Sequence, residues 1–517
     1  MKKILFTLFS SLLFLQISCQ NKLADALFEN FEYRSAIKYY NNPLVVSNHL
    51  FKNDSINDLI RIKLALSYFR IHDYENAENV FKEIIGQKHI DPMFYYDYAI
   101  CLKNNKKYDD ARLFFSKVKE LDSTHYLNDL HLTSIDSLVI WDTLKENVEV
   151  AEIKAINSSL AEYCPRFYHD GILICSEQKY DSLKQRVMID LFSSMDRALE
   201  DETEKRILEE KVIHELDYGE SLSPRSSLIY IPLNEKAKLF DKKALYDIPE
   251  DVFGERKVFA ENKGFNIGSF NIDEINDELY FTKTYPFNRW EPDISNHSLL
   301  YKANIDKVKH RLTKKKLVHI KRISKVFAIG EPAMSSDGNM MYFVSDKPKG
   351  EGGTDIYFIE KNKKGKWGKP INLGPEINTQ CDELSPFLYD DKKLYFSTNG
   401  HVGYGGLDIY VVDVLGDSLL GPPEILSSPL NSVADDFGIS LHPTNESIAI
   451  FVSNRHEGPG DDDLYLAHFT DLNPYVKGFV LSETGALQEG AIVRLMNENN
   501  EELAKLKTQA NGKYRLI

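Results

Sequence analysis

Three aspartates with matching neighbours are the residues of this chain whose type and spacing could hold a metal ion. Asp355, Asp408 and Asp463 each follow a glycine-containing loop and each begin an apolar, tyrosine-containing segment. Carboxylates in such loops are ligands that Ca²⁺ prefers, and they also accept hydrogen bonds from loop amides. Capping needs no further ligands, so we predict loop caps at these positions and no bound metal.

Hydrolytic chemistry would require a nucleophile or a metal-bound water in a recognisable setting. The nearest approach to a serine-hydrolase elbow is the segment 219–223, Gly-Glu-Ser-Leu-Ser, which lacks the second glycine. His214 and Glu215 would need a histidine at position 218 to form a zinc-binding helix, and Tyr218 stands there. No glycine-rich phosphate loop occurs either. The sequence therefore predicts a protein that is not an enzyme and that holds no cofactor.

The first cysteine is a candidate for covalent lipid attachment. Lys2 and Lys3 precede an apolar run over residues 4–15, and the small residue Ser18 stands directly before Cys19. A basic start and a short apolar run are typical of an export signal. The end of the run resembles the lipobox of bacterial lipoproteins, which implies a signal peptide over 1–18 and lipidation at Cys19. Ordinary cleavage near this point is the alternative. In the lipoprotein pattern Gln20, rather than an aspartate, implies the periplasmic face of the outer membrane.

The other four cysteines show no metal-ligand spacing; they are Cys101, Cys164, Cys175 and Cys381. Cys164 and Cys175 flank a turn around His169 and Asp170, which would place them opposite each other on antiparallel strands. An export signal makes a disulfide between them possible. Two separate buried thiols are the alternative, because free cysteine packs well in cores.

Composition and length limit the classes of partner and the number of domains. The chain has 517 residues and a net charge of −15. This charge would repel the phosphates of nucleic acids, so we expect no nucleic-acid partner. A chain of this length is too long for one core and suggests roughly three or four domains.

A repeated hairpin sequence must position the three aspartates. Strand-like segments at 342–346, 395–399 and 450–454 each lead to one of the aspartate loops, and the tyrosines that follow lie 53 and 55 residues apart. This spacing is typical of a four-stranded blade in a radially repeated β fold. We predict a β-propeller over 131–472 with five or six blades. The first blade is expected to use 165–176 and 188–192, and the segments around 227–231 and 244–248 form either a sixth blade or an insertion.

A second repeat, of helical period, precedes the propeller. Apolar positions from Leu64 to Phe81 recur from Tyr98 to Phe115 at an offset of 34 residues, which matches the tetratricopeptide repeat. We predict an all-α solenoid over 19–130, whose concave face binds protein partners. The partner-binding residues expected on that face are Arg70, Tyr96, Lys103 and Asn104. The alternative is that these residues solvate the groove or pack on the following domain.

The propeller sequence resembles a known family. The blade pattern is similar to the PD40, TolB-like form of the WD40 propeller, and the connection over 367–383 resembles a segment of OmpA-family outer-membrane lipoproteins of the Bacteroidetes. The resemblance implies helical repeats, then the propeller, then a carboxypeptidase-regulatory-like β-sandwich, and finally an OmpA-like domain that binds peptidoglycan. Residues 473–517 are similar to the opening strands of that sandwich, so we expect this domain to be incomplete. Peptidoglycan binding is expected only if a missing C-terminal domain exists.

Together these patterns predict a non-catalytic scaffold. The resemblance implies a lipid anchor in the outer membrane and protein partners in the outer membrane or periplasm, in an assembly of the type IX secretion or gliding kind. The alternative is a propeller that binds a peptide or a glycan.

Overall fold

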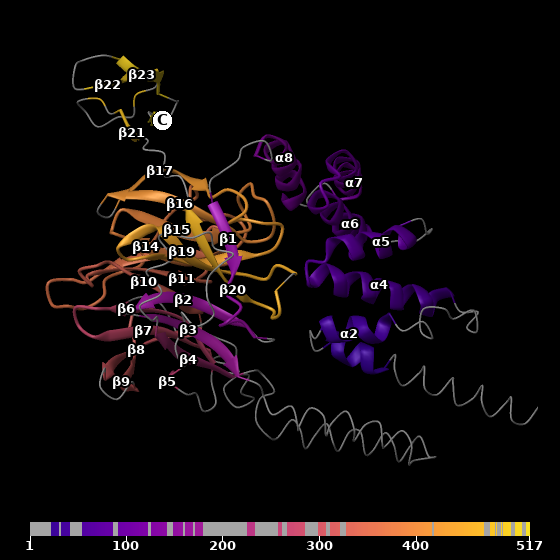
Figure 1. The fold of residues 1–517 in the computed structure, drawn as a ribbon, viewed down its shortest axis with the longest axis horizontal. Coiled ribbons are helices and arrows are strands. Elements are labelled where there is room, and N and C mark those ends of the chain that lie inside the picture. Colours follow the sequence, from indigo (N-terminus) through magenta and orange to yellow (C-terminus); the bar gives the residue numbers. More distant parts are fainter. Residues whose placement is uncertain are drawn as a thin grey trace, which may run out of the picture.

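The computed structural model describes most of the helical part and most strands of the propeller. The described residues are 22–29, 33–41, 54–85, 91–122, 126–141, 148–158, 161–168, 171–178, 225–232, 257–260, 266–284, 298–306, 311–320, 327–415, 418–456, 458–469, 476–480, 482, 488, 490–497, 502–508 and 513–516. Helices come first, a ring of β-sheets follows, and four short strands come last (Figure 1).

Consecutive helices pack against each other in the first part of the chain. A helix over 22–29 is followed by α2 (Tyr33–Tyr40), α4 (Asp54–Arg70), α5 (Tyr74–Ile84), α6 (Pro92–Asn104), α7 (Tyr108–Leu121) and α8 (Tyr126–Trp141). Side-chain caps fix two of the helix starts: Asp73 accepts a hydrogen bond from the Asn76 amide, and Asp91 accepts one from the Met93 amide. Since α8 extends through position 130, the helical part continues to Trp141, beyond the boundary predicted from the sequence.

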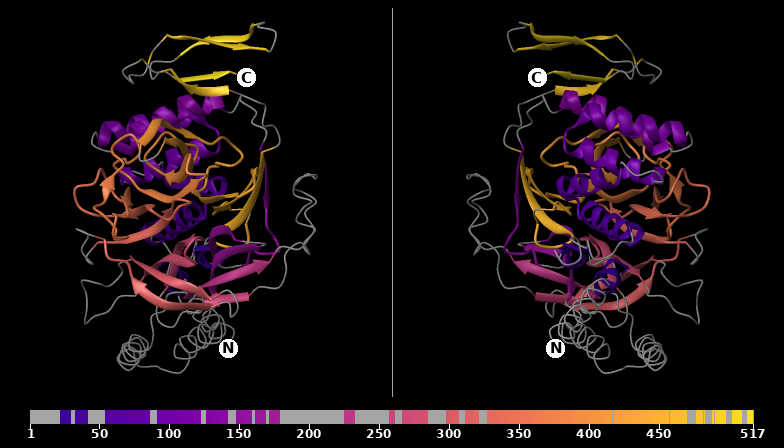
Figure 2. Two further views of the ribbon diagram at one scale, coloured as in Figure 1. Left: turned by 90° about the vertical axis from the view of Figure 1, so that its left-hand side faces the viewer. Right: turned by 90° about the vertical axis from the view of Figure 1, so that its right-hand side faces the viewer.

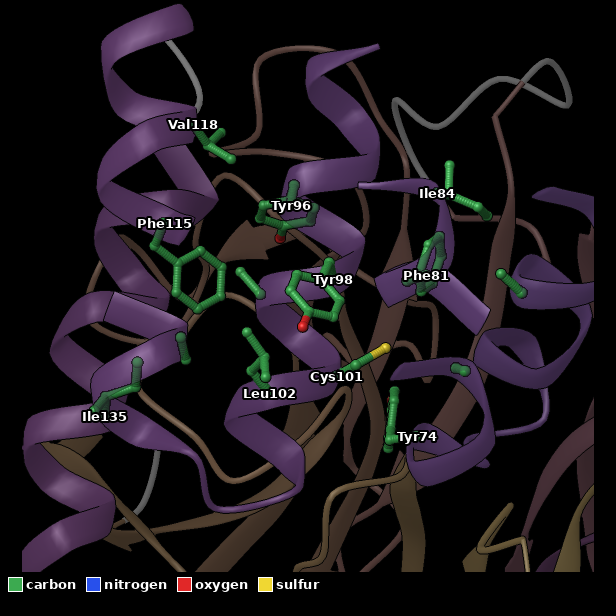
Figure 3. Close-up of a cluster of buried hydrophobic side chains, with 14 residues drawn as sticks. Tyr74, Phe81, Ile84, Tyr96, Tyr98, Cys101, Leu102, Phe115, Val118 and Ile135 are labelled. Atoms are coloured by element: carbon green, nitrogen blue, oxygen red, sulfur yellow. The ribbon is translucent and has the colours of Figure 1, made fainter. Parts of the chain in front are cut away.

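The residues of the 34-residue repeat form the core between these helices. Ala77 and Phe81 on α5 and their counterparts Ala111 and Phe115 on α7 are fully buried in one cluster (Figure 3). The alanines leave room for neighbouring helices to approach closely, and the phenylalanines fill the space between successive helix pairs. The spacing in the sequence therefore reports real packing positions.

The second part contains five four-stranded antiparallel sheets among the described residues. The first four sheets follow chain order: β2 (Glu162–Tyr168), β3 (Gly171–Gln178), β4 (Arg225–Pro232) and β5 (Lys257–Ala260); β6 (Asn266–Asp273), β7 (Glu278–Thr284), β8 (Ser298–Asp306) and β9 (Arg311–Leu317); β10 (Ile329–Met334), β11 (Met340–Ser345), β12 (Asp355–Glu360) and β13 (Ile371–Asn372); β14 (Glu383–Tyr389), β15 (Lys393–Thr398), β16 (Asp408–Leu415) and β17 (Ser418–Ile425). The fifth sheet combines β18 (Asp436–His442), β19 (Asn445–Ser453) and β20 (Asp463–Phe469) with β1 (Val148–Glu152).

The five sheets close into a ring. The first strand of each sheet contacts the first strand of the next, in the cycle β2, β6, β10, β14, β18 and back to β2. Strand β1 comes from the other end of the propeller sequence and pairs with β20, from Val148 opposite Phe469 to Glu152 opposite Tyr465. The molecule is therefore a β-propeller whose last sheet is completed by its first strand, as Figure 2 shows from two sides.

One strand assignment made from the sequence needs correction. The segment 227–231 belongs neither to a sixth sheet nor to an insertion, because it lies in β4, the third strand of the first sheet, and pairs with β3 along its whole length. Residues 188–192, expected to supply that third strand, lie outside the described residues, as does 244–248. The long segment between β3 and β4 broke the blade spacing on which the assignment relied.

The last part of the chain forms two strand pairs that stand apart from the propeller (Figures 1 and 2). Strand β21 (Val476–Phe479) pairs with β24 (Lys513–Leu516), and β22 (Ile492–Met496) pairs with β23 (Glu502–Lys507). Strands occur here as the sequence predicted, and their assignment to a regulatory-like sandwich stays a prediction.

Candidate functional site

A repeated asparagine joins neighbouring sheets of the ring. The Asn378 side chain accepts a hydrogen bond from the Ile356 amide at 2.8 Å and donates one to the Ile356 carbonyl at 3.0 Å. Asn431 makes the same pair of bonds to Ile409, at 2.7 and 2.9 Å. Each amide side chain thus pairs with the third strand of the sheet before it, as a neighbouring backbone would.

The residue after each asparagine forms hydrogen bonds with the first strand of the next sheet. Thr379 donates from its amide and its hydroxyl to the Glu383 carboxylate, at 2.8 and 2.7 Å. Ser432 does the same to Asp436, at 2.6 and 2.8 Å. Since Glu383 and Asp436 begin the first strands of the following sheets, each Asn-Ser/Thr pair links two neighbouring sheets.

A third copy of this link lies between β1 and β2 and joins the two ends of the propeller sequence. Asn157 exchanges two hydrogen bonds with Leu464, at 2.8 and 3.1 Å, across 307 positions of sequence. Ser158 donates to Glu162 at the start of β2, at 2.9 and 2.8 Å. The first sheet is thereby joined to the last by the same side chains that join sheets along the chain. The sequence contains a shared pattern at 156–162, 377–383 and 430–436. In each segment an apolar residue is followed by Asn, then by Ser or Thr, then by any three residues and an acidic residue.

The three candidate calcium ligands cap their own loops. Asp355 accepts a hydrogen bond from the Glu351 amide at 3.0 Å, Asp408 one from Gly405 at 3.2 Å, and Asp463 one from Gly460 at 3.0 Å. The predicted capping is confirmed in all three loops. Within the described part of the chain, no group of three or more His, Cys, Asp or Glu residues is placed to hold a metal ion.

The paired glycines of the first two of these loops are required by close backbone packing. A Cβ atom on Gly405 would lie 2.4 Å from the Ser432 carbonyl oxygen, and one on Gly352 would lie 2.2 Å from that of Thr379. Both distances are far below van der Waals contact. Only glycine therefore lets each loop lie against the connection between the sheets.

The helices pack on the loops at one side of the fourth and fifth sheets. On α5 and the turn before it, the Tyr74 hydroxyl donates to the Val433 carbonyl at 3.4 Å, and His72 Nε2 lies 3.8 Å from Asp435 Oδ2. Further contacts run along the helical part: Arg34 donates to the Gly460 carbonyl at 3.1 Å, Ser134 accepts from the Gly403 amide at 3.4 Å, and Trp141 packs on Tyr404 with ring centroids 5.0 Å apart. The two parts thus form one composite body.

The residues predicted to bind partners lie in or beside this internal contact. Lys103 is only 2% exposed, and the negative charge of Asp408 on the propeller acts on its ammonium group. Tyr96 is buried, and its hydroxyl lies 2.9 Å from His131 Nε2. Asn104 is half-buried and lies beside the Tyr74 hydroxyl, whereas Arg70 is exposed. Lys103 and Asn104 thus lie toward the propeller, in agreement with the alternative that such residues pack on the following domain. A partner role for the four residues stays a prediction.

Burial changes the protonation of this contact. It lowers the pKa of Lys103 to about 8, although the nearby Asp408 charge acts in the opposite direction. Burial likewise raises the pKa of Asp408 well above its usual range. The pKa of His72 is lowered because burial outweighs the attraction of Asp435 and Asp436. The contact therefore favours neutral side chains.

A recurrent bulge shapes the axis of the ring. In every sheet the pairing register between the first and second strands shifts at one point of the first strand. The residues at these points are Cys164, Gly268, Glu331, Ser385 and Gly438, one in each sheet. Four of these residues have left-handed φ angles of 52–64°. A bulge of this kind turns the following side chains of the strand. In β2 the residue turned in this way is Arg166.

Arg166 reaches from the first sheet to the fourth and fifth. Its Nη1 donates to the Pro165 carbonyl at 2.8 Å and approaches the Ile439 carbonyl at 3.5 Å, and its guanidinium lies 5.1 Å from the centre of the Phe387 ring. Burial lowers the Arg166 pKa, and the charge of Glu331 on β10 is one of the influences that oppose this. Glu331 itself accepts a hydrogen bond from the Ser385 amide. The charges of an arginine and a glutamate from different sheets thus influence each other.

The lipidation and disulfide predictions have different outcomes. Cys19 lies outside the described residues, so lipidation there stays a prediction. Cys164 and Cys175 are both buried free thiols, and Cys175 Sγ lies 3.2 Å from the Gly268 carbonyl. Among the described residues no helix combines the length and the apolar character that a bilayer crossing requires.

Comparison with known proteins gives similarity at the level of solved structures alone. No family model matches the chain, and no curated protein does. A putative TolB from Agrobacterium tumefaciens is 14% identical, with a TM-score of 0.28 over 50% of this chain and 92% of that one. An alpha-L-arabinofuranosidase from Lactobacillus brevis is 10% identical, with a TM-score of 0.35 over 65% of this chain and 97% of that one. A protein of unknown function from Dyadobacter fermentans is 8% identical, with a TM-score of 0.33 over 62% and 99%. Similarities this distant carry no conclusion about activity.

Proposed function

We propose that this chain is a non-catalytic interaction scaffold, held by a lipid on Cys19 at the periplasmic face of the outer membrane. The observation that carries the proposal is the contact between helices and propeller. It joins two repeat modules into one composite body through His72, Tyr74 and Trp141. A larger body with fixed geometry can hold several partners at set distances, which is what an envelope assembly of the type IX secretion or gliding kind requires.

Apolar side chains on α7 are candidate partner contacts. Leu113 is 65% exposed and Leu121 is 55% exposed. Nearby, Tyr95 and Phe114 stack with centroids 6.2 Å apart, and Lys117 lies 4.0 Å from the centre of the Tyr95 ring. Apolar and aromatic residues of this kind are enriched in protein interfaces. The α7 surface is thus left for a partner while other parts of the helical stack contact the propeller.

Copurification tests this function. The full-length chain would be tagged, extracted gently from envelopes and compared with a Leu113→Asp variant. The expected result is a set of envelope proteins that copurify with the native chain and decrease with the variant. Ile275→Asp on the propeller is the matched control, because Ile275 is 68% exposed but lies far from α7 in the sequence and on another module. A native chain that migrates alone would contradict the proposal.

The membrane anchor needs a separate measurement. Replacing Cys19 by serine removes the only residue proposed to carry the lipid. We expect this variant to leave the membrane fraction. The native chain should stay with outer-membrane markers and should be released from them by treatment with a lipase. Equal membrane association of both chains would exclude lipidation at Cys19.

A further inference from the structure

The outer strand of the second sheet lies in a strongly basic segment of an otherwise acidic chain. Between positions 307 and 325 Lys or Arg occurs at nine positions and no Asp or Glu occurs, although the whole chain has a net charge of −15. Strand β9 belongs to this segment, and its consecutive Lys314, Lys315 and Lys316 are all exposed. Because β9 is the last strand of its sheet, these lysines lie on the outside of the ring (Figure 1).

A β-bulge explains how three consecutive side chains reach the surface. The pairing register between β8 and β9 shifts here, so that Lys314 and Lys315 together oppose a single residue of β8, Ala303. Lys314 takes a left-handed φ of 53° at this point. In a regular strand successive side chains point to opposite faces, and a bulge interrupts that alternation. The strand therefore exposes neighbouring lysines rather than only every second one.

Nearby acids do not balance the charge of this surface. Among the side chains that the structure describes, none of the three lysines has a carboxylate within ion-pair distance. The carboxylate of Glu278 on β7 is bound by Lys302 on β8 instead, at 2.7 Å. Also on β7, Lys283 lies 5.1 Å from the centre of the Tyr301 ring. Burial and, after it, the positive charge of Lys315 lower the pKa of Lys283, so the ammonium groups of β9 and β7 act on each other.

Protection of a sheet edge does not by itself require these lysines. Charged side chains on an outer strand prevent unwanted pairing with another sheet. The outer strands of three other sheets differ from β9, since β17 contains Pro422 and Pro423, β13 has two residues, and β1 contains Glu149 and Glu152. An edge of this ring is thus protected by prolines, by shortness or by negative charge equally well. A cluster of positive charge needs a further reason, and an anionic partner supplies one.

The chemistry of the surface favours an anionic membrane over a single bound anion. Lysine ammonium groups act as separate point charges, whereas the planar fork of arginine is better suited to one fixed anion. Point charges on an exposed edge match the mobile headgroups of an anionic bilayer. Such a bilayer repels a chain of net negative charge, so a lysine-rich edge determines which side of the molecule approaches it.

We propose that the outer edge of the second sheet, with the exposed Lys314–Lys316 at its centre and Lys283 beside them, binds the anionic phospholipid headgroups of a membrane surface. The contact orients the propeller relative to the bilayer. It goes beyond the proposed scaffold role and is separate from the lipid proposed on Cys19, because it requires only electrostatic attraction to the folded β9.

Cosedimentation with lipid vesicles tests this contact, using the full-length chain with Cys19→Ser so that no lipid is attached there. Vesicles of phosphatidylglycerol mixed with phosphatidylcholine are compared with vesicles of phosphatidylcholine alone, which subtracts any apolar contribution of the N-terminal residues. Each lysine near an anionic surface contributes about fivefold to affinity. Replacing all three of Lys314–Lys316 by Gln should therefore weaken binding to the charged vesicles roughly a hundredfold. High salt should likewise weaken binding of the chain that keeps these lysines.

A matched control removes the same number of charges elsewhere on the propeller. Lys363, Lys364 and Lys366 are exposed in the turn between β12 and β13, and replacing them by Gln should leave vesicle binding almost unchanged. A second variant replaces Lys314–Lys316 by Glu, which keeps the edge charged and protected but reverses its sign. This variant should lose binding to the charged vesicles, and it decides the matter should the Gln variant aggregate.

The outcomes are distinct from those that test the scaffold role. Equal binding to charged and neutral vesicles would overturn the proposal, as would an equal loss of binding in the β9 variant and its control. Polyglutamate serves as a second probe. Binding of polyglutamate through the same lysines, without binding to charged vesicles, would also overturn the proposal and would indicate an acidic protein segment instead. Copurification of envelope proteins is unaffected by any of these results, because it is measured on the α7 surface.

Discussion

The buried Asp97 of α6 makes the stability of the helical part depend on pH. The side chain is 6% exposed, and burial raises its pKa from 3.8 to about 7, with Arg70 opposing the shift and Asp91 adding to it. The folded state therefore holds this proton more tightly than the unfolded state does. The free energy of unfolding should decrease as the pH rises from about 4 to about 7 and then stay constant. A difference of about three pKa units corresponds to about 4 kcal/mol.

Replacing Asp97 by asparagine should remove this dependence. At pH 8 the variant should be more stable than the native chain by up to about 4 kcal/mol, less the attraction to Arg70 that it loses. At pH 4 the folded native side chain is protonated and the unfolded one is partly protonated, because its ordinary pKa is 3.8, so the two proteins should differ much less. The variant is uncharged at either pH, so the gain comes entirely from the native carboxylate.

Urea unfolding followed by circular dichroism at pH 4 and pH 8 measures the difference. Asp110→Asn is the matched control, because Asp110 is an exposed aspartate on the neighbouring α7. Its effect should stay within about 0.5 kcal/mol at both pH values. An equal gain for Asp97→Asn at the two pH values would refute the reasoning, as would a loss at pH 8.

Three further outcomes are expected. Asn431→Ala should destabilise the propeller by about 2–4 kcal/mol, and Asn157→Ala by less because Asn157 is only half-buried; equal melting temperatures of the two variants would contradict this. Gly405→Ala should lower the melting temperature because the added methyl group would clash with the Ser432 carbonyl; an unchanged value would count against the close packing. Because burial lowers the pKa of His72, protonation should weaken the helix–propeller contact as the pH falls below about 6.5. Hydrogen exchange at 431–435 should then rise at pH 5.5 in the native chain but not in His72→Phe.

Local repetition made much of the fold predictable. The strands around Tyr342, Tyr395 and Phe451 were expected from their alternating pattern and the loops that follow them, and they are the second strands of three sheets. The helices around Ala77 and Ala111 were expected from their shared offset. In each case the residues that form the pattern and the residues that they contact lie close together in the sequence. A short segment therefore contains enough information to predict the strand or helix.

The parts that were missed depend on contacts between distant segments. Nothing near Val148 indicates that β1 pairs with Phe469, because its alternating residues would fit any sheet edge. β4 was misassigned because a long segment separates it from β3. The buried position of Lys103 was equally hidden, since a lysine on a helix is usually solvated. The Asn157 link was readable as a repeat of 377–383, but its partner Leu464 was not.

The pairing of β1 with β20 determines how the ring would respond to mechanical tension. Val148, where the chain enters the propeller from the helices, lies opposite Phe469, where the chain leaves toward β21. A pull between the two flanking modules would thus act at one end of the strand pair and open its hydrogen bonds one after another, like a zipper. The helix contacts at Tyr404 and Val433 would have to detach before the full load reached that strand. Docked helices would in this way shield the seam of the propeller from such a force.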